Sequence, residues 1–578
     1  MAEAGITITV LVDLLAVFII AAAVGIIVAK VGRFPYTIAL LLAGFGASVL
    51  GASNLVDITL SHDLILLVLL PPLLFEGAAT TDLERLRRNA LPILLLAVVG
   101  LIVSVAVLGV ASTYALGLSP LIALLFAAMI LPTDPVSVLA LFEELGAPDR
   151  LSVLVEGESL LNDGVGVVLF SALLVPATQG ADISAVTAPG SLADLVFEIG
   201  VVSLGGAAIG FAAGYAVYSV MVNLDEHMTE IVLTIILAYG SFLLAEHYLH
   251  VSGVIATVVA GLLIGNRGAE YAMSPQTKIA IFNTWETGAF IVNTFIFLMI
   301  GVKTPLPDLL DNWELIAIAI PLTLLARAVT VYPLAMLSNR LTKPTIPLEY
   351  QHVMIWGGLH GSIPIALVLG LPTEGLIDAA LQTKLRALVF GVAAFSLVVQ
   401  GLTVGTVIDR LNIVTRSEAE ELFELLIGRA RAVDAAIEAA SDLHDDGSIP
   451  TEVYRDFTAE YEQEKAALND SISELLSSNP ELRHEQLLTG ERRILQQEKS
   501  AIMDSIRTGV VNDDTGRQLL QEVNLKLDHV RDGESTVERR AEGFEEFWRS
   551  QAREFGLEAV AEDQFGDAGE PDDESTGR

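Results

Sequence analysis

The sequence predicts an all-α polytopic membrane protein with a helical cytoplasmic domain at its C-terminus. Of its 578 residues, 53% are hydrophobic, and the mean hydropathy of +0.59 is too high for a soluble protein. The apolar runs end near residue 412, after which polar and charged residues dominate. Two of the apolar runs contain helix-breaking residues at their centres. We therefore assign 1–412 to the membrane, 413–560 to a cytoplasmic helical domain and 561–578 to a disordered acidic tail.

About thirteen apolar runs are long enough to cross a bilayer. They lie near 7–30, 35–52, 63–79, 90–116, 119–146, 151–177, 191–223, 228–248, 251–266, 276–302, 312–338, 350–371 and 384–409. The third is interrupted by Pro71-Pro72, and the ninth is short. The N-terminal Met-Ala-Glu-Ala lacks the basic region of a secretory signal peptide, so we expect the first run to remain as a span.

The orientation is predicted by the basic residues, which concentrate in alternate connections between spans. These residues are Lys30, Arg33, Arg85, Arg87, Arg88, Arg150, Arg267, Lys278, Arg340, Lys343 and Arg410. Connections rich in Lys and Arg stay in the cytoplasm. We therefore expect a multi-pass protein of the cell membrane with its N-terminus outside and its C-terminal domain cytoplasmic.

The charge and cysteine content exclude several classes of protein. The net charge is −37, and no basic tract is present that would bind nucleic acid. Cysteine is absent, which excludes disulfides and thiolate–metal sites. Because salt screens self-repulsion, an acidic excess of this size fits the salt-rich cytoplasm of a halophile. No nucleotide-binding motif occurs, and no cofactor is expected.

Spans five and twelve contain the helix-breaking sequences. In the fifth the sequence is Pro132-Thr133-Asp134-Pro135, and in the twelfth it is W-G-G-L-H-G-S-I-P over 356–364. Unpaired backbone groups at membrane depth are tolerated only beside a cavity or protein. The two lie seven spans apart, an odd number, so they run in opposite directions. Paired broken helices in inverted halves indicate a secondary transporter with its site at mid-membrane.

Three acidic residues lie within otherwise apolar segments, where each costs about 2.5–3.5 kcal/mol on insertion scales: Asp134, Glu158 and Asp163. Ser159 and Asp163 share one helical face and together offer the oxygen ligands that a small alkali cation requires. Glu158 faces elsewhere, and Arg327 in span eleven is the available partner. We expect Asp134 to neutralise the amide ends of a facing half-helix.

An ion-binding carboxylate of this kind is sufficient for exchange. The empty, charged site is costly to carry through a medium of low dielectric constant. The protein therefore changes face only when a proton or a cation occupies Asp163, and the two cargoes compete for the same oxygens.

Five motifs in this order resemble the NhaP/NHE-type sodium/proton antiporters of the cation-proton antiporter superfamily. They are T-D-P-V (133–136), E-G-E-S-L-L-N-D (156–163), R-A-V-T-V-Y (327–332), W-G-G-L-x-G (356–361) and V-Q-G-L-T (399–403). The resemblance implies an inverted-repeat fold with two crossed broken helices, usually as a homodimer, whose core domain moves against a dimerisation domain.

The resemblance also implies roles for single residues. Asp163 of the Asn162-Asp163 pair binds Na⁺ or H⁺ in turn, and Ser159, Glu76 and the Thr133 carbonyl help to coordinate the ion. Glu158 and Arg327 form a structural ion pair. Members with Asn-Asp at this position are typically electroneutral, exchanging one proton per cation.

One position departs from the family pattern. Where the family commonly has arginine in W-G-G-L-R-G, this chain has His360. A fixed cation is thus replaced by a group that titrates near neutrality. We expect a neutral imidazole bonded to freed carbonyls; the alternative is a pH sensor.

Other functions remain open at this point. A potassium/proton or lithium-tolerant exchanger would use the same residues. A channel is disfavoured because ionisable groups in broken helices favour occluded sites. An intramembrane protease would need Asp134 and Asp163 to share a proton, and Asn162 argues against that. A carrier of organic anions would need cations at the breaks.

The residues after Arg410 predict amphipathic helices. Ser417 and Glu420 have the spacing of a capping box that opens a helix carrying Leu422, Leu426, Val433 and Ile437. A second helix carries Val453, Phe457 and Tyr461, and further segments follow at about 482–507, 514–530 and 536–555. We expect this domain to regulate or dimerise the membrane part.

Overall fold

The structure is a computed structural model of the whole chain. It describes residues 2–31, 35–49, 61–134, 138–139, 142, 146–184, 189–222, 224, 226–372, 374–413, 418–507, 509–531, 533 and 535. Ser417, the predicted segment near 536–555 and the acidic tail lie outside these residues, as does most of the fifth run beyond Asp134.

The described part of the chain is helical throughout and contains no β-strand, only an isolated bridge between Asp134 and Leu359. The chain divides into two compact units, Met1–Thr415 and Arg416–Arg578. The prediction of an all-helical protein is therefore confirmed.

The helices of the first unit follow the predicted apolar runs. In order they are α1 (Ala2–Val31), α2 (Tyr36–Val49), η2 (Leu64–Leu69), α3 (Leu70–Thr80), α4 (Leu83–Arg88), α5 (Ala90–Leu94), η3 (Leu95–Gly100), α6 (Leu101–Ala115), α7 (Pro120–Ile130), α9 (Asp149–Thr178), α11 (Pro189–Met221), α12 (His227–Leu243), η4 (Leu244–Tyr248), α13 (Gly253–Leu263), η5 (Ile264–Gly268), α14 (Ala269–Tyr271), α15 (Pro275–Val302), α16 (Leu306–Asp311), α17 (Trp313–Leu341), α18 (Leu348–Trp356), α19 (Ser362–Leu369), α20 (Ala379–Phe395), η6 (Ser396–Gln400) and α21 (Gly401–Arg410). The η segments are π-helical turns.

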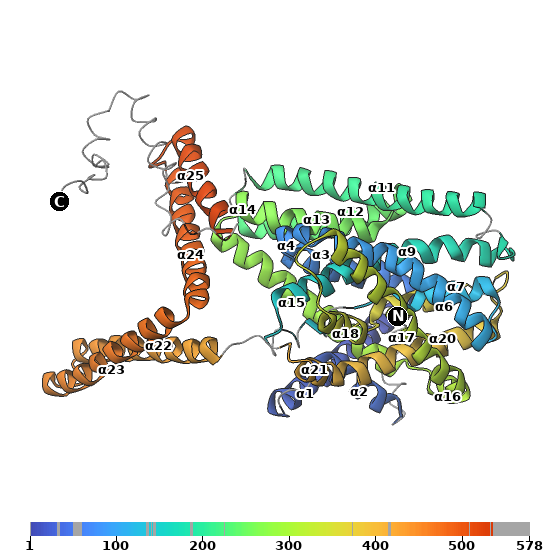
Figure 1. The fold of residues 1–578 in the computed structure, drawn as a ribbon, viewed down its shortest axis with the longest axis horizontal. Helices are drawn as coiled ribbons and strands as arrows, with labels where there is room; N and C mark the ends of the chain where they lie inside the picture. Colours follow the sequence, from blue (N-terminus) through green and yellow to red (C-terminus); the bar gives the residue numbers. More distant parts are fainter. Residues whose placement is uncertain are drawn as a thin grey trace, which may run out of the picture. The chain divides into compact units, whose positions relative to one another are not determined.

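Within the described residues, eight of the continuous helices are long and apolar enough to cross a membrane. Shorter apolar helices occupy Tyr36–Val49, Leu64–Thr80 and Pro120–Ile130. Figure 1 shows α11, α12 and α13 side by side along one edge of this unit. Helix α7, whose residues are almost all buried, packs against α6 and α9 in the interior. The interior of the unit is therefore built around α7 and α9.

The third run is a continuous helix from Leu64 to Thr80 despite Pro71-Pro72. The expected interruption is absent because the π-helical turn η2 precedes the two prolines, which occupy the first turn of α3. Pro72 has no N–H to donate to the Val68 carbonyl four residues earlier. The Tyr239 hydroxyl on α12 donates to this oxygen instead, at 2.9 Å.

The described residues of the second unit form two helical hairpins (Figure 1): α22 (Glu418–Asp445) with α23 (Thr451–Ser478), and α24 (Pro480–Arg507) with α25 (Asp513–Arg531). Among the less exposed residues of α22 is a series at alternating four- and three-residue spacing: 426, 430, 433, 437 and 440. This spacing is typical of a coiled-coil seam. The core of the second hairpin is small and comprises Leu495, Val523, Leu527 and Val530.

Candidate functional site

The two helix breaks meet in the interior of the first unit. Helix α18 ends at Trp356 and α19 begins at Ser362, while α7 ends at Ile130 and is followed by a non-helical stretch up to Asp134. The Asp134 N–H donates to the Leu359 carbonyl at 2.7 Å. The proline and glycine clusters therefore break both segments, as the sequence predicts, and a backbone hydrogen bond joins the breaks.

His360 lies between the two broken segments and is only 2% exposed. Its Nδ1 lies 3.2 Å from the Pro132 carbonyl, and because that partner can only accept, Nδ1 carries the proton. The ring thus contacts a backbone carbonyl of the other broken segment.

The Asp134 carboxylate lies against Gly361, the residue that precedes α19. A Cβ atom added to Gly361 would be 2.0 Å from Asp134 Oδ2, so only glycine allows this approach. The first N–H groups of a helix carry partial positive charge. The carboxylate is therefore placed at the end of α19, where we expected it to compensate charge.

Thr133, Ser159 and Asn162 form a buried polar cluster, each no more than 3% exposed. The Thr133 and Ser159 hydroxyls are 2.9 Å apart. The Asn162 amide donates to Thr133 Oγ1 at 2.9 Å, and Asn162 Oδ1 accepts from the Thr133 N–H at 3.3 Å. Ser159 is thus joined to Asn162 through Thr133, a link that spacing along one helix does not predict.

Asp163 follows this cluster on α9 and is partly exposed. Within the described residues, no hydrogen bond or ion pair engages its carboxylate. The Asp134 carboxylate is close enough for the two charges to interact. A Cβ atom on the adjacent Gly164 would be 2.6 Å from Ile255 of α13, so α9 packs closely at this point. The site therefore combines an available carboxylate with a fixed set of neutral oxygens.

Glu158 and Arg327 form a buried ion pair, with Arg327 Nη2 at 3.0 Å from Glu158 Oε1 and both side chains 7% exposed. The same Nη2 donates to the Met354 carbonyl of α18 at 2.9 Å. A Cβ atom on Gly358 would be 2.5 Å from Arg327 Nε, so the guanidinium lies directly on the broken segment. Arg327 therefore joins α9 to the C-terminal end of α18, where a cation is favourable.

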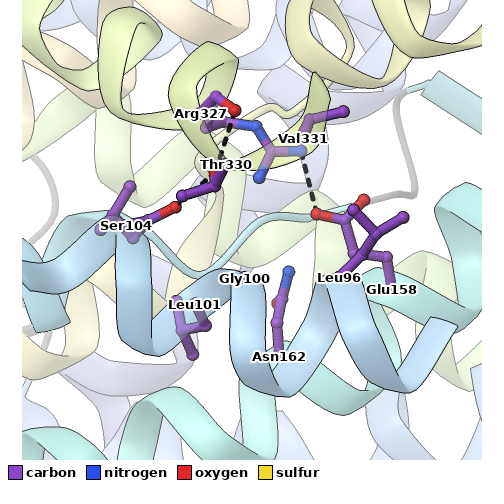
Figure 2. Close-up of a pocket in the computed structure, with 10 residues that line it drawn as sticks. Leu96, Gly100, Leu101, Ser104, Glu158, Asn162, Arg327, Thr330 and Val331 are labelled. Carbon is purple, nitrogen blue, oxygen red and sulfur yellow. Dashed lines mark hydrogen bonds and ion pairs between the residues drawn. The ribbon is translucent and has the colours of Figure 1, made fainter. Parts of the chain in front are cut away.

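A small cavity of about 10 Å³ adjoins this ion pair, with room for about one water molecule. Figure 2 shows Arg327 and Thr330 of α17 on one side of it and Glu158 and Asn162 of α9 on the other. The hydroxyls of Ser104 and Thr330 are 2.8 Å apart at its edge. Asn162 therefore belongs both to this cavity and to the Thr133 cluster.

Glu76 lies in a different setting from the other predicted ligands. It lines a second small cavity with Phe75, Trp285 and neighbouring apolar residues. Its carboxyl group interacts electrostatically with Glu156 and Glu286. Among the described residues, no hydrogen bond joins it to Asp163 or Ser159. The structure therefore brings Thr133, Ser159 and Asn162 together and leaves Glu76 outside that cluster.

Two buried side chains at the twelfth-span break had no role assigned from the sequence. The Ser396 hydroxyl accepts from the His360 N–H at 3.0 Å. Gln400 Nε2 donates to the Trp356 carbonyl at 2.8 Å. The sequence does contain a signal for Gln400: it is a glutamine in the apolar run S-L-V-V-Q-G-L, and a buried amide requires a hydrogen-bond partner.

Comparisons with known proteins identify the family of the chain. Residues 18–410 match the family described as "Sodium/hydrogen exchanger, transmembrane". The Na(+)/H(+) antiporter ApNhaP of Aphanothece halophytica is 37% identical over 86% of this chain and 92% of its own length. The Na(+)/H(+) antiporter NhaG of Bacillus atrophaeus is 35% identical over 89% and 97%. The Na(+)/H(+) antiporter NhaH of Halobacillus dabanensis is 35% identical over 67% and 95%.

The fold resembles that of a solved structure. The sodium proton antiporter MjNhaP1 from Methanocaldococcus jannaschii, at pH 8, aligns with a TM-score of 0.56 and 18% identity over 69% of this chain and 97% of that chain. At this identity the likeness concerns the fold alone. The family match spans most of the first unit, and ApNhaP and NhaG match along nearly their whole length. The chain therefore belongs to the sodium/hydrogen exchanger family of membrane transporters.

Proposed function

We propose that this chain is a secondary active sodium/proton antiporter in which Na⁺ and H⁺ compete for Asp163. The observation that supports the proposal most directly is the position of this carboxylate. It follows a buried cluster of hydroxyl and amide groups beside two broken helices, and no described side chain neutralises it. Relatives that match nearly their whole length are named Na(+)/H(+) antiporters.

The proposed ligands of the sodium ion are the Asp163 carboxylate, the Ser159 hydroxyl, the Thr133 carbonyl and Glu76. Oxygen atoms of these types suit a hard cation. The role of Asn162 is to hold Thr133, since its amide bonds both the hydroxyl and the N–H of that residue. Glu76 is included because the family resemblance implies it, although it lines a separate small cavity.

Coupling follows from the cost of moving an uncompensated charge. The Glu158–Arg327 pair is neutral as a unit, and Asp134 is balanced by the end of α19. An empty Asp163 is therefore the charge that opposes the change of face. One Na⁺ or one H⁺ removes it equally well, which supports electroneutral one-to-one exchange by alternating access.

We further propose the finer architecture of the family for the first unit: about thirteen spans in inverted repeats, crossed half-helices at spans five and twelve, and a homodimer in the cell membrane with its N-terminus outside. The bond between Asp134 and Leu359 supports the crossing. The basic side chains of α4 and the residues near Arg150 and Lys343 support a cytoplasmic position for those connections.

Exchange by the purified protein in proteoliposomes tests this function. We expect an inward Na⁺ gradient to drive proton efflux, with no net current on a solid-supported membrane because the exchange is one for one. Li⁺ is expected to substitute for Na⁺. Equal or faster proton movement with K⁺ would instead support the alternative, a potassium/proton antiporter of the same fold. A net current that follows the exchange rate would contradict electroneutrality.

The cytoplasmic domain expected at 413–560, most of which lies in the second unit, is proposed to regulate or dimerise the transporter. Outside its coiled-coil seam, α22 exposes large apolar side chains: Leu422 is 45% exposed, Leu425 69% and Leu443 46%. Exposed apolar side chains on a two-helix hairpin are available for contact with a further partner. NhaH, named an antiporter, covers only 67% of this chain while using 95% of its own length. A relative that is named an antiporter is therefore too short to contain a full counterpart of the second unit.

Deletion of residues 417–578 tests this proposal. We expect the truncated protein to keep the Na⁺ dependence of exchange, because the proposed ion ligands all lie in the first unit. Its pH dependence or its oligomeric state is expected to change, measured by exchange across a pH series and by mass photometry. A truncated protein that matches the full chain in both would remove the regulatory and dimerising role.

A further inference from the structure

We propose that Ser396 and Gln400 keep the twelfth-span helix broken and so position the ion site. These two side chains, which we call the η6 bracket, belong to the π-helical turn between α20 and α21. Ser396 is 0% exposed and Gln400 2%. Each bonds the backbone of the broken segment, Ser396 at His360 N–H and Gln400 at the Trp356 carbonyl.

The two bonded groups are the halves of one missing helical hydrogen bond. In a continuous α-helix the N–H of residue 360 donates to the carbonyl of residue 356. Here the Ser396 hydroxyl accepts from this N–H at 3.0 Å and Gln400 Nε2 donates to this carbonyl at 2.8 Å. The η6 bracket thus replaces the bond that the break removes. Without it, one buried and one part-buried backbone group are left unpaired or pair with each other, which shortens the break.

The state of this break is transmitted to the ion site through the fifth span. The Leu359 carbonyl accepts from the Asp134 N–H at 2.7 Å, and the His360 ring donates to the Pro132 carbonyl at 3.2 Å. Thr133 lies between these two anchored residues and bonds both Ser159 and Asn162. A shortened break therefore moves Thr133 relative to α9.

The π-helical form of η6 adds to this interpretation. The Gly401 N–H bonds the Ser396 carbonyl five residues earlier, as in a π-turn. Such turns occur frequently at functional sites. Ser396 also donates to the Ala393 carbonyl at 2.9 Å, so its hydroxyl is held in the orientation that accepts from His360. The two bracket residues are positioning residues, since neither contacts the proposed ion ligands.

The inference rests on the proposed sodium site and is tested with Ser396→Ala and Gln400→Met, which remove the polar groups at similar volume. We expect each to raise the KM for Na⁺ about threefold to tenfold, the range of one neutral hydrogen bond. Ser396→Thr keeps the hydroxyl and is expected to restore the KM. The readout is the initial rate of proton movement against Na⁺ concentration, normalised to the amount of folded protein in the vesicles.

Matched controls separate positioning from general stability. Ser241 is 1% exposed and donates to the carbonyl three residues earlier, as Ser396 does. Gln351 is 7% exposed and donates to the Ile346 carbonyl at 3.0 Å. Ser241→Ala removes a bond on α12, and Gln351→Met removes a bond at the start of α18, at the opposite end from the break. We expect them to leave the KM for Na⁺ unchanged even where they lower the melting temperature.

The double variant provides a second measurement. Once one bracket bond is lost, the freed backbone group pairs within the segment, so the second loss costs less. The combined rise in KM is therefore expected to be smaller than the product of the single rises. If both single variants keep the wild-type KM, as the controls do, the inference is overturned. Continued exchange by Asp163→Asn would overturn the sodium site itself, which the bracket variants alone cannot do.

Discussion

Replacing Asp163 by asparagine is expected to abolish Na⁺-driven proton movement. The substitution preserves size and hydrogen-bonding capacity but removes the group that binds a proton and balances the sodium charge. The bound Na⁺ would then lack its negative partner, and removing one partner of a buried charge pair costs about 3–5 kcal/mol. We therefore expect the rate of exchange to fall by at least about a hundredfold. The measurement is proton efflux from proteoliposomes under an inward Na⁺ gradient.

The matched control for this prediction is Asp311→Asn, the same change at an exposed residue of the same unit. We expect that variant to exchange ions at the wild-type rate. The folded fraction of both proteins is checked by size-exclusion chromatography. Undiminished exchange by Asp163→Asn would mean that another group carries the ions.

Replacing Arg327 by leucine is expected to have the largest effect on stability. The change leaves Glu158 buried without its cation and the Met354 carbonyl without its donor. Breaking a buried ion pair typically costs about 3–5 kcal/mol. We therefore expect a clear fall in the melting temperature of the detergent-solubilised protein, and loss of exchange because α18 is no longer joined to α9.

A second variant distinguishes the ion pair from the helix end. Glu158→Leu combined with Arg327→Leu removes both charges, and we expect it to be more stable than Arg327→Leu alone. It still lacks the donor to Met354, so exchange is expected to remain impaired. Arg267, whose side chain is exposed and lies over the Tyr218 ring, is the matched control. A melting temperature for Arg327→Leu equal to that of Arg267→Leu would contradict this account.

The sequence was most informative where single residue types have strong physical consequences. The proline and glycine clusters at 132–135 and 356–364 predict the breaks, and apolar length predicts the helices that the structure contains. The pairing of Glu158 with Arg327 could also be predicted from the sequence, because a buried arginine in an apolar span needs an anionic partner. Each of these inferences depends on the free-energy cost of leaving a backbone group or a charge without a partner in the membrane.

The sequence was less informative where contacts depend on how distant segments meet. Helical spacing groups Ser159 with Asp163, whereas the structure joins Ser159 to Asn162 through Thr133 from another segment. The bonds of Ser396 and Gln400 to the broken helix depend on the packing of η6 against residues about forty positions earlier. The continuous helix at Pro71-Pro72 depends on a π-turn that residue propensities do not reveal.

The hydrogen bond from Tyr239 to the Val68 carbonyl has a consequence for transport. This oxygen has lost its helical donor to a proline, and α3, which carries Glu76, begins two residues later. Separating α3 from α12 would break this bond and leave the Val68 oxygen without its Tyr239 donor, which is unfavourable in hydrocarbon. We therefore expect α12 to move together with α3 in any displacement that brings Glu76 toward the ion.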